Sequence, residues 1–383
     1  MGNVLATIGV ALWIYLICAR GRFWLCPVRD DASLPSPAIW PSVTAVIPAR
    51  NEAEVIAQSV KSLLQQDYPG PLAVIVVDDD SGDGTAAAAT AATALAGGNR
   101  QVTVVVSQGP PAGWTGKLWA LKQGIAAAEA SRPDYLLLTD ADIVHAPDTL
   151  SWLVAQSSAG GFVLTSLMAK LRCRSLAERS HVPAFVYFFQ MLFPFPWVCR
   201  PDSRTAAAAG GCMLIRADAL RSAGGIDSIR NALIDDCSLA ARLKAVGPIW
   251  LGLTDRVRSI RPYETFADVK AMIARSAYAQ LGYSPVLLTA TTAGMAITFL
   301  LPPWLAIFAS GAAQYLGLAL WLAMAASLQP MLRFYRLSPL WGMALPGIAL
   351  LYALYTLESA YQHWRRRGGQ WKGRVHVNAP SLP

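Results

Sequence analysis

The feature that most constrains the fold is an apolar segment that runs directly into a cluster of acids. Residues 72–77 form a continuous apolar run of the kind found in buried parallel strands. Asp78, Asp79, Asp80 and Asp83 follow, mixed with two glycines and two hydroxyl residues. In open α/β sheets, ligands bind beyond the carboxyl ends of the strands, so this loop is a candidate binding loop. The alternative is a solvated acidic turn that caps a helix.

A second apolar segment ends in the same way. Residues 135–138 lead into Thr139, Asp140, Ala141 and Asp142, about 60 residues after the first cluster. On an extended segment, carboxylates at positions i and i+2 share one face. Two hard oxygen donors suit Mg²⁺ or Mn²⁺. Two such clusters predict a metal and phosphate site at one edge of a sheet.

Strand-like and helix-like segments alternate through this part of the chain. We predict strands at 43–48, 72–77, 102–106 and 135–138, helices at 55–65 and 86–96, and a third helix that residues 113–117 open and that runs through 128. This order predicts an α/β fold with a mostly parallel sheet in three layers.

The rest of the chain has the composition of a membrane protein. Only 15% of the residues are charged and 54% are hydrophobic, against about 25% charged in soluble domains. Apolar runs at 4–19, 286–308, 312–328 and 339–357 predict N-terminal and C-terminal transmembrane helices. A signal peptide is the alternative for the first run, and buried soluble helices for the other three.

The basic residues conflict with a simple count of crossings. Arg20, Arg22 and Arg29 place the central domain in the cytoplasm by the positive-inside rule, and Arg333 and Arg336 place a later loop there. The tail also favours the cytoplasm, through Arg365, Arg366, Arg367, Lys372 and Arg374. Three C-terminal crossings would put it outside, so one run is expected to be re-entrant or interfacial. The net charge of +8 suits a protein against anionic lipid, and we do not expect nucleic-acid binding.

Four motifs in order carry a family resemblance: PARNE at 48–52, DDDSGDGT at 78–85, GKLWALKQG at 116–124 and TDAD at 139–142. The chain resembles the family-two inverting glycosyltransferases. With its flanking membrane segments, it is similar to the hopene-associated glycosyltransferases of bacterial hopanoid biosynthesis. The resemblance implies a glycosyltransferase A-type nucleotide-diphospho-sugar transferase fold.

The resemblance also implies roles for the donor-side residues. Asp79 would read the uracil ring, and Lys117 would lie near the donor. Asp140 would lie near the ribose or donor sugar, and Asp142 would bind Mg²⁺ or Mn²⁺, with Asp140 as a second candidate ligand. The loop around the nucleotide would contain Pro48, Ala49 and Glu52.

The acceptor-side residues lie in the second half. Gly210 and Gly211 resemble the family's acceptor-side strand, where small residues admit a substrate. Asp235 and Asp236 match the family's acidic motif, with Asp236 as the catalytic base; helix N-capping is the alternative. Of the family's Q-x-x-R-W motif only Arg275 remains, which argues against a processive synthase. The aromatic segment 185–198 is either core or a membrane-surface segment.

These observations predict the following organisation: an anchor at 1–25, a catalytic domain at 36–280 with halves at 36–145 and 146–280, membrane helices at 285–358 and a basic tail at 359–383. We expect a multi-pass protein of the bacterial inner membrane with a cytoplasmic catalytic domain. It would move a sugar from a UDP-sugar to a lipid hydroxyl of the hopanoid type. Ceramide, glycerolipid and polyprenyl phosphate are alternative acceptors.

Two other classes fit the sequence less well. A nucleotidyltransferase would carry a Gly-rich basic phosphate loop after its first strand, and PARNE is not one. A membrane transporter with a soluble regulatory domain would place ionisable residues within its spans, whereas the C-terminal runs contain little beyond Gln314 and threonines.

Overall fold

The computed structural model describes residues 2–94, 100–365, 370–371 and 374–375. They fall into two compact units. The sheet unit contains Val28–Arg172 and Trp197–Arg261. The helical unit contains the described part of Met1–Pro27, together with Cys173–Pro196 and the described part of Pro262–Gln370.

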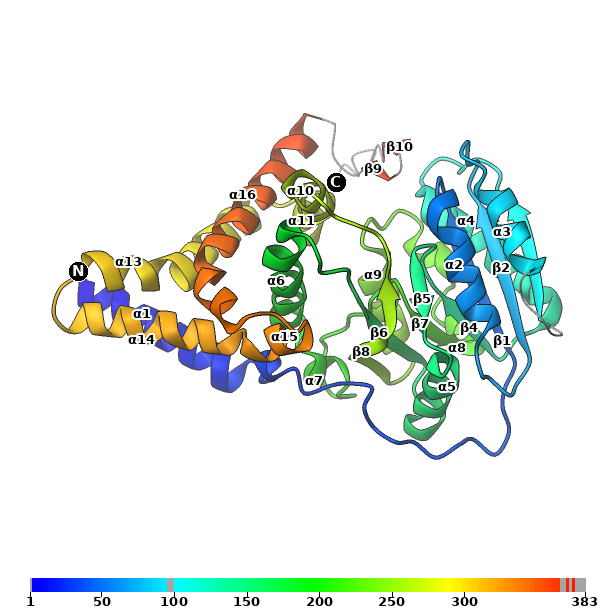
Figure 1. Ribbon diagram of the computed structural model, residues 1–383, viewed down its shortest axis with the longest axis horizontal. Helices are drawn as coiled ribbons and strands as arrows, with labels where there is room; N and C mark the ends of the chain where they lie inside the picture. The colour runs from blue at the N-terminus through cyan, green and yellow to red at the C-terminus, as the bar shows by residue number, and fades with distance from the viewer. Residues whose placement is uncertain (1, 95–99, 366–369, 372–373, 376–383) are drawn as a thin grey trace. The chain divides into compact units, whose positions relative to one another are not determined.

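The sheet unit is built on one eight-stranded sheet in the order β3-β2-β1-β4-β7-β6-β8-β5 (Figure 1). The first four strands of that order are parallel, with Val43 level with Leu72 and Tyr135. Beyond them β7 runs antiparallel to β4 and β6, while β6 and β8 are parallel. The predicted α/β fold is confirmed, and its second half is a mixed sheet. The strands are β1 (Val43–Ala49), β2 (Leu72–Asp78), β3 (Gln101–Val106), β4 (Tyr135–Leu138), β5 (Ile143–His145), β6 (Leu164–Lys170), β7 (Met213–Arg216) and β8 (Ile249–Ser259).

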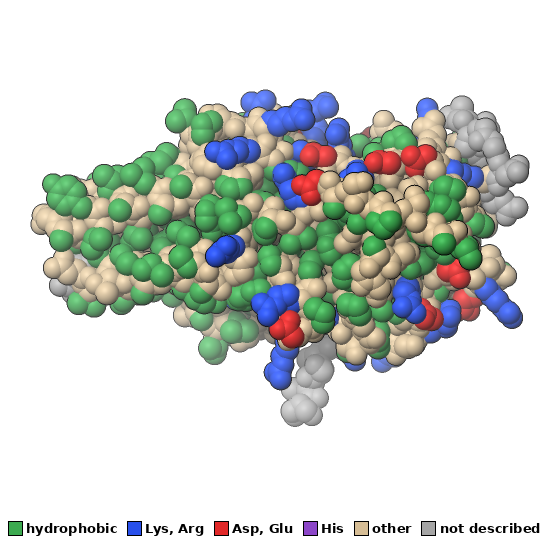
Figure 2. Space-filling model, turned by 90° about the horizontal axis from the view of Figure 1, so that it is seen from below, with side chains coloured by type: hydrophobic (Ala, Val, Ile, Leu, Met, Phe, Trp, Pro, Cys, Tyr) green, Lys and Arg blue, Asp and Glu red, His purple; other side chains and the backbone are tan. Residues whose placement is uncertain are grey.

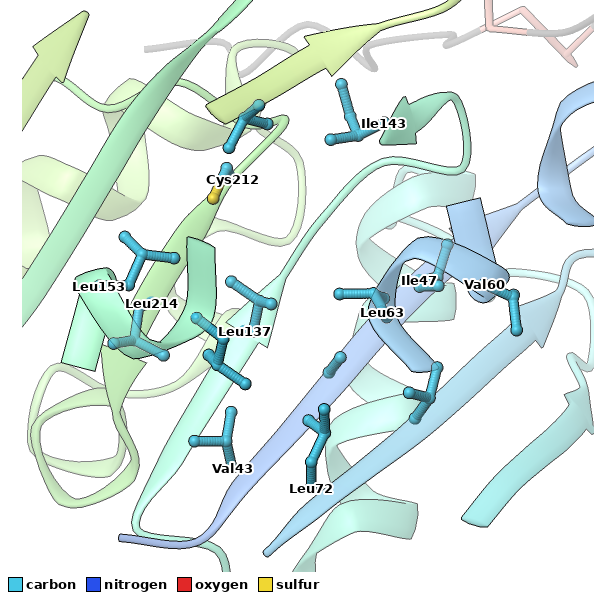
Figure 3. Packing of buried hydrophobic residues seen from close by; sticks show 14 of the residues in the cluster. Val43, Ile47, Val60, Leu63, Leu72, Leu137, Ile143, Leu153, Cys212 and Leu214 are labelled. Carbon is cyan, nitrogen blue, oxygen red and sulfur yellow. The ribbon is translucent and has the colours of Figure 1, made fainter. Parts of the chain in front are cut away.

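Helices cover both faces of this sheet, as predicted. Successive residues of a strand point to opposite faces. Ile47 of β1 belongs to a buried cluster with Val60 and Leu63 of α2, which Figure 3 shows facing the strands. Its neighbour Val46 lies on the other face, where a Cβ on Gly124 of α4 would be 2.5 Å from Val46 Cγ1. The helices of this unit are α2 (Ala53–Leu64), α3 (Thr85–Ala94), α4 (Gly116–Ala128), α5 (Thr149–Gly160), α8 (Ala217–Ser222) and α9 (Asp235–Lys244).

The helical unit contains three helices long and apolar enough to cross a membrane, at Pro285–Phe308, Ala312–Phe334 and Pro339–Trp364. They match the predicted C-terminal runs. The first comprises α12 (Pro285–Met295), a π-helical turn (Ala296–Leu300) and α13 (Leu301–Phe308). The second comprises α14 (Ala312–Ser327) and α15 (Gln329–Phe334). The third comprises a 3₁₀ turn (Pro339–Ala344) and α16 (Leu345–Trp364). Figure 2 shows hydrophobic side chains over much of the helical surface. These helices indicate a membrane-associated protein.

The N-terminal helix is shorter than a full span. It covers α1 (Gly2–Ile14) and a π-helical turn (Tyr15–Ala19). Gly21 and Arg22 have positive φ, and Phe23–Leu25 forms a separate 3₁₀ turn. Phe23–Leu25 therefore does not continue this helix, because the left-handed backbone before it ends the helix.

The aromatic segment 185–198 lies mostly in α6 (Leu176–Leu192) and packs into the core of the helical unit. Tyr187 is buried, and its hydroxyl lies 2.8 Å from Ser327 Oγ. The ring of Phe188 packs edge-on against Tyr352. These contacts support the core alternative.

The remaining short elements are α7 (Phe195–Val198), α10 (Phe266–Ala274), α11 (Ala277–Gln280), β9 (Gln370–Trp371) and β10 (Arg374–Val375). Arg366, Arg367 and Lys372 of the predicted basic tail lie outside the described residues, as do residues 95–96 of the predicted 86–96 helix.

Candidate active site

The loops that follow β1 and β2 are joined to each other by hydrogen bonds. The backbone N–H of Asn51 donates to Ser81 Oγ (2.9 Å), and that of Gly82 donates to Asn51 Oδ1 (3.0 Å). The N–H of Ala53 donates to Asp83 (3.0 Å). Asp83 therefore organises the loop. It also accepts hydrogen bonds from Thr85 at the start of α3.

Asp79, the predicted uracil-reading residue, lies at the carboxyl end of β2 and is completely buried. Its N–H donates to the carbonyl of Ala49 (2.8 Å), which follows Pro48 in β1. Its carboxylate lies 3.7 Å from Arg50 Nη1. The structure thus brings Pro48, Ala49 and Asp79 together, with Arg50 as a partner that the sequence did not single out.

Lys117 projects from the first turn of α4, which Thr115 caps by accepting from the N–H of Leu118. The lysine ammonium lies 2.9 Å from Asp140 and 3.0 Å from Asp235. Burial alone would lower the pKa of Lys117, but the two carboxylate charges outweigh it and raise that pKa. The predicted donor-side lysine therefore also binds a predicted acceptor-side residue.

Asp236, the predicted base, lies in the first turn of α9. Its two oxygens accept from the N–H of Gly210 (3.0 Å) and of Cys237 (2.7 Å). Burial and the charge of Asp235 raise the pKa of Asp236 to about 6, and Lys117 opposes that shift. A carboxylate with such a pKa is suited to accept a proton near neutral pH. The N-cap residue of α9 is Ile234, so neither acid occupies the capping position.

Asp140 and Asp142 do not lie on an extended segment as predicted. β4 ends at Leu138, and the N–H of Ile143 donates to the carbonyl of Asp140 (3.2 Å), which closes a turn. Because the chain turns, the two carboxylates have different partners. Asp140 pairs with Lys117, and Asp142 accepts from Ser259 Oγ (2.8 Å).

Arg261, which sequence reasoning missed, bridges two of the predicted site residues. Its guanidinium lies 3.1 Å from Asp142 and 2.6 Å from Glu52. Arg261 follows the end of β8, and its position at the end of a strand was the available signal. Glu52 lies in the loop after β1, so Arg261 connects that loop to the TDAD turn.

Gly210 and Gly211 enter β7 beside these carboxylates. A Cβ on Gly211 would be 3.0 Å from Ile143 Cδ1, so this glycine is explained by tight packing. Its carbonyl accepts from Thr139 Oγ1 (2.7 Å), which ties it to the TDAD turn. Arg275 follows α10 in the helical unit, and its assignment to the acceptor side remains a prediction.

The comparisons with known proteins fit this geometry. Residues 41–277 match the family model for "Glycosyltransferase like family 2". The chain belongs to this family. It is therefore a glycosyltransferase, as the motifs predicted. A search of curated protein sequences finds no match.

One solved structure supports the fold. The mannosyltransferase PcManGT from Pyrobaculum calidifontis, in complex with GDP-Man and Mn²⁺, has a TM-score of 0.58 at 19% identity, covering 95% of this chain and 99% of that one. S. aureus TarS in complex with UDP-GlcNAc has a TM-score of 0.39 at 15% identity, covering 85% and 92%. The first of these likenesses indicates a shared glycosyltransferase A-type fold.

Proposed function

We propose that this glycosyltransferase transfers a sugar from a nucleoside diphosphate donor to the hydroxyl of a membrane lipid, with inversion. The observation that carries the proposal is the cluster of Lys117, Asp140, Asp235 and Asp236 beside Gly210. It joins elements from both halves of the sheet: the start of α4, the turn after β4 and the start of α9. A transferase must hold its donor and its acceptor side by side, so its active site is expected where elements of both halves are in contact.

The chemistry assigned to the cluster is a single displacement. The acceptor oxygen bonds to the anomeric carbon as the bond from that carbon to the donor phosphate oxygen breaks. The electron pair of that bond leaves with the nucleoside diphosphate, and Asp236 accepts the acceptor proton. The N–H groups of Gly210 and Cys237 orient the Asp236 carboxylate for this role. Lys117 places a positive charge beside the reacting centre.

We assign a divalent cation, Mg²⁺ or Mn²⁺, to Asp142, with Asp140 as a second ligand. The oxygen donors fit such a hard cation, because Mg²⁺ uses one or two carboxylates together with substrate phosphates and water. No group of three or more His, Cys, Asp and Glu side chains suited to a metal occurs among residues 2–94 and 100–365. The donor diphosphate is therefore expected to complete the ligand set. When bound, the cation supplies positive charge to the leaving diphosphate.

The donor base is assigned to the Ala49–Asp79 region. The family resemblance favours UDP, while PcManGT was solved with GDP-Man. The buried Asp79 carboxylate is suited to accept hydrogen bonds from N–H groups on the edge of the nucleotide base. The base would then displace the guanidinium of Arg50, which lies beside this carboxylate. Both nucleotides therefore belong in the assay.

The apolar helices support a lipid acceptor, because they would hold the enzyme at the bilayer where lipid hydroxyls are exposed. A hopanoid-type triterpenoid is the acceptor we propose, on the resemblance alone; ceramide, glycerolipid and polyprenyl phosphate are alternatives. Arg20, Arg22, Arg333 and Arg336 flank these helices and favour a cytoplasmic catalytic domain in a multi-pass protein of the bacterial inner membrane.

Purified protein in detergent, given radiolabelled UDP-sugars or GDP-sugars and bacterial membrane lipid, tests the proposal. We expect a labelled lipid that depends on Mg²⁺ or Mn²⁺ and disappears with chelator. Hopanoid-free lipid extract serves as the control for the acceptor. Failure to bind any nucleotide sugar would reject the donor site, whereas binding without lipid labelling would reject the acceptor class.

A further inference from the structure

The sequence left open which apolar run does not cross the membrane, and the contacts of the helical unit single out α16. Its exposed apolar side chains recur every three or four residues along its whole length. They form one narrow stripe: Leu350, Leu354, Leu357, Tyr361 and Trp364. Such a helix offers one face to lipid and its other faces to protein.

The neighbours of α16 at its midpoint include polar groups. The Tyr352 hydroxyl donates to the carbonyl of His181 in α6 (2.9 Å). One turn earlier in α6, the buried Glu178 carboxylate accepts from the N–H groups of Ser175 and Tyr263. If α16 crossed the bilayer, its midpoint would bring this ionisable residue to the membrane centre, where such groups are costly.

The second half of α16 has charged neighbours as well. Ser359 Oγ donates to the carbonyl of Ala274, the last residue of α10. α10 carries exposed Asp268 and Lys270, and Arg275 follows it. Glu358 and Gln362 on α16 itself are hydrogen-bonded to each other. A crossing helix would draw these charges into the hydrocarbon, whereas a helix at the surface leaves them in the headgroup region.

The hairpin of α13 and α14 differs from α16. Its exposed residues cover a wide arc of α14, including Tyr315, Leu316, Leu318 and Leu322. The turn between the two helices, residues 309–311, carries no charge. α1 packs against α14 through Gly9, whose Cβ position would be 3.1 Å from Leu320 Cδ1 (Figure 1). These helices are suited to be surrounded by lipid on most sides.

We propose that α16 lies along the cytoplasmic membrane surface, with its Leu350–Trp364 stripe in the lipid interface, while α1 and the α12–α14 segments cross. The proposal rests on the membrane attachment proposed above. It removes the conflict between the number of crossings and the positive-inside rule, because Arg333, Arg336 and Arg365 then lie on the same side of the membrane as Arg20 and Arg22.

Side-specific labelling of the full chain tests this arrangement. A C-terminal green fluorescent protein fusion is expected to fluoresce, and an alkaline phosphatase fusion at the same end is expected to be inactive. In a cysteine-free background that still binds nucleotide sugar, Ser310→Cys should react with an impermeant maleimide in intact cells, and Ser338→Cys only after lysis. A C-terminus on the same side as Ser310 would overturn the proposal.

Depth measurements decide the question independently of the crossings. In proteoliposomes, nitroxide labels at Leu350, Leu354, Leu357 and Tyr361 are expected to show one shallow depth. Labels at Tyr315, Leu318 and Leu322 on α14 are the matched control and should change in depth along the helix. A comparable gradient along α16 would overturn the proposal. If Ser310 and Ser338 label from the same side, the proposed multi-pass arrangement fails, while a uniform shallow depth would still support an interfacial α16.

Discussion

Two neighbouring charge clusters in the sheet unit are built differently. In the lysine cluster, Lys117 faces Asp140 and Asp235, and Asp236 follows in the same helical turn. In the arginine cluster, one guanidinium bridges Asp142 and Glu52. The lysine cluster has three carboxylates around one lysine ammonium, and the arginine cluster has two carboxylates around one guanidinium.

The difference in charge balance indicates a division of labour. Burial and the neighbouring negative charge of Asp235 raise the pKa of Asp236 to about 6, which suits proton transfer. A guanidinium is always charged and binds carboxylates and phosphates in a fixed geometry. We therefore infer that the lysine cluster accepts the proton of the acceptor hydroxyl. The arginine cluster, we infer, binds the divalent metal ion and the donor phosphates.

The largest effect is expected from Asp236→Asn. This change removes the proposed base while keeping the shape of the side chain, so kcat should fall by about 10³-fold. Donor affinity, measured by calorimetry, should change little. Activity close to that of the native protein would assign the proton to another group and end the distinction between the clusters.

Asp142→Asn should reduce activity by about 10²-fold, because it removes a charge from the proposed cation site. Unlike the Asp236 variant, it should also weaken Mn²⁺ binding in the presence of nucleotide. Electron paramagnetic resonance measures this binding. Unchanged Mn²⁺ affinity would place the cation elsewhere.

Arg261→Gln tests the role of the arginine cluster. Without nucleotide, Mn²⁺ should bind about tenfold more tightly, because a competing positive charge is lost from Asp142 and Glu52. Donor binding should weaken. Arg261→Lys should largely restore both, and Arg258→Gln on the exposed part of the same strand is the control. Weaker Mn²⁺ binding would mean that Arg261 merely orders Asp142.

The smallest effect is a shift of the pH profile. A base with a raised pKa works when deprotonated, so activity should fall as the pH drops below about 6. Asp235→Asn removes a repelling charge, lowers the pKa of Asp236 and should extend activity to lower pH. Lys117→Met removes the opposing cation and should shift the profile upward. Equal shifts in the same direction would contradict the charge balance described above.

The sequence predicted the strand and helix order of the first half well, because apolar runs and acidic loops are local signals. It also singled out Asp140 and Asp235, whose carboxylates both lie beside Lys117. It did not predict the pairing of Lys117 with Asp235 or the bridge made by Arg261, because those contacts join residues about 120 or more positions apart in the chain. The turn at Asp140 was missed for a similar reason, since the partners of the Asp140 and Asp142 carboxylates, Lys117 and Ser259, come from other parts of the chain.

The joined loops after β1 and β2 have a consequence for the kinetics of donor exchange. Asn51 in the loop after β1 is hydrogen-bonded to Ser81 and Gly82 in the loop after β2, and Ala53 is hydrogen-bonded to Asp83. Opening one loop breaks hydrogen bonds in the other, so the amide protons of Asn51, Ala53 and Gly82 should exchange with deuterium as one cooperative group. A nucleotide that enters beside Asp79 would then slow exchange in both loops at once, and product release would require both to open together.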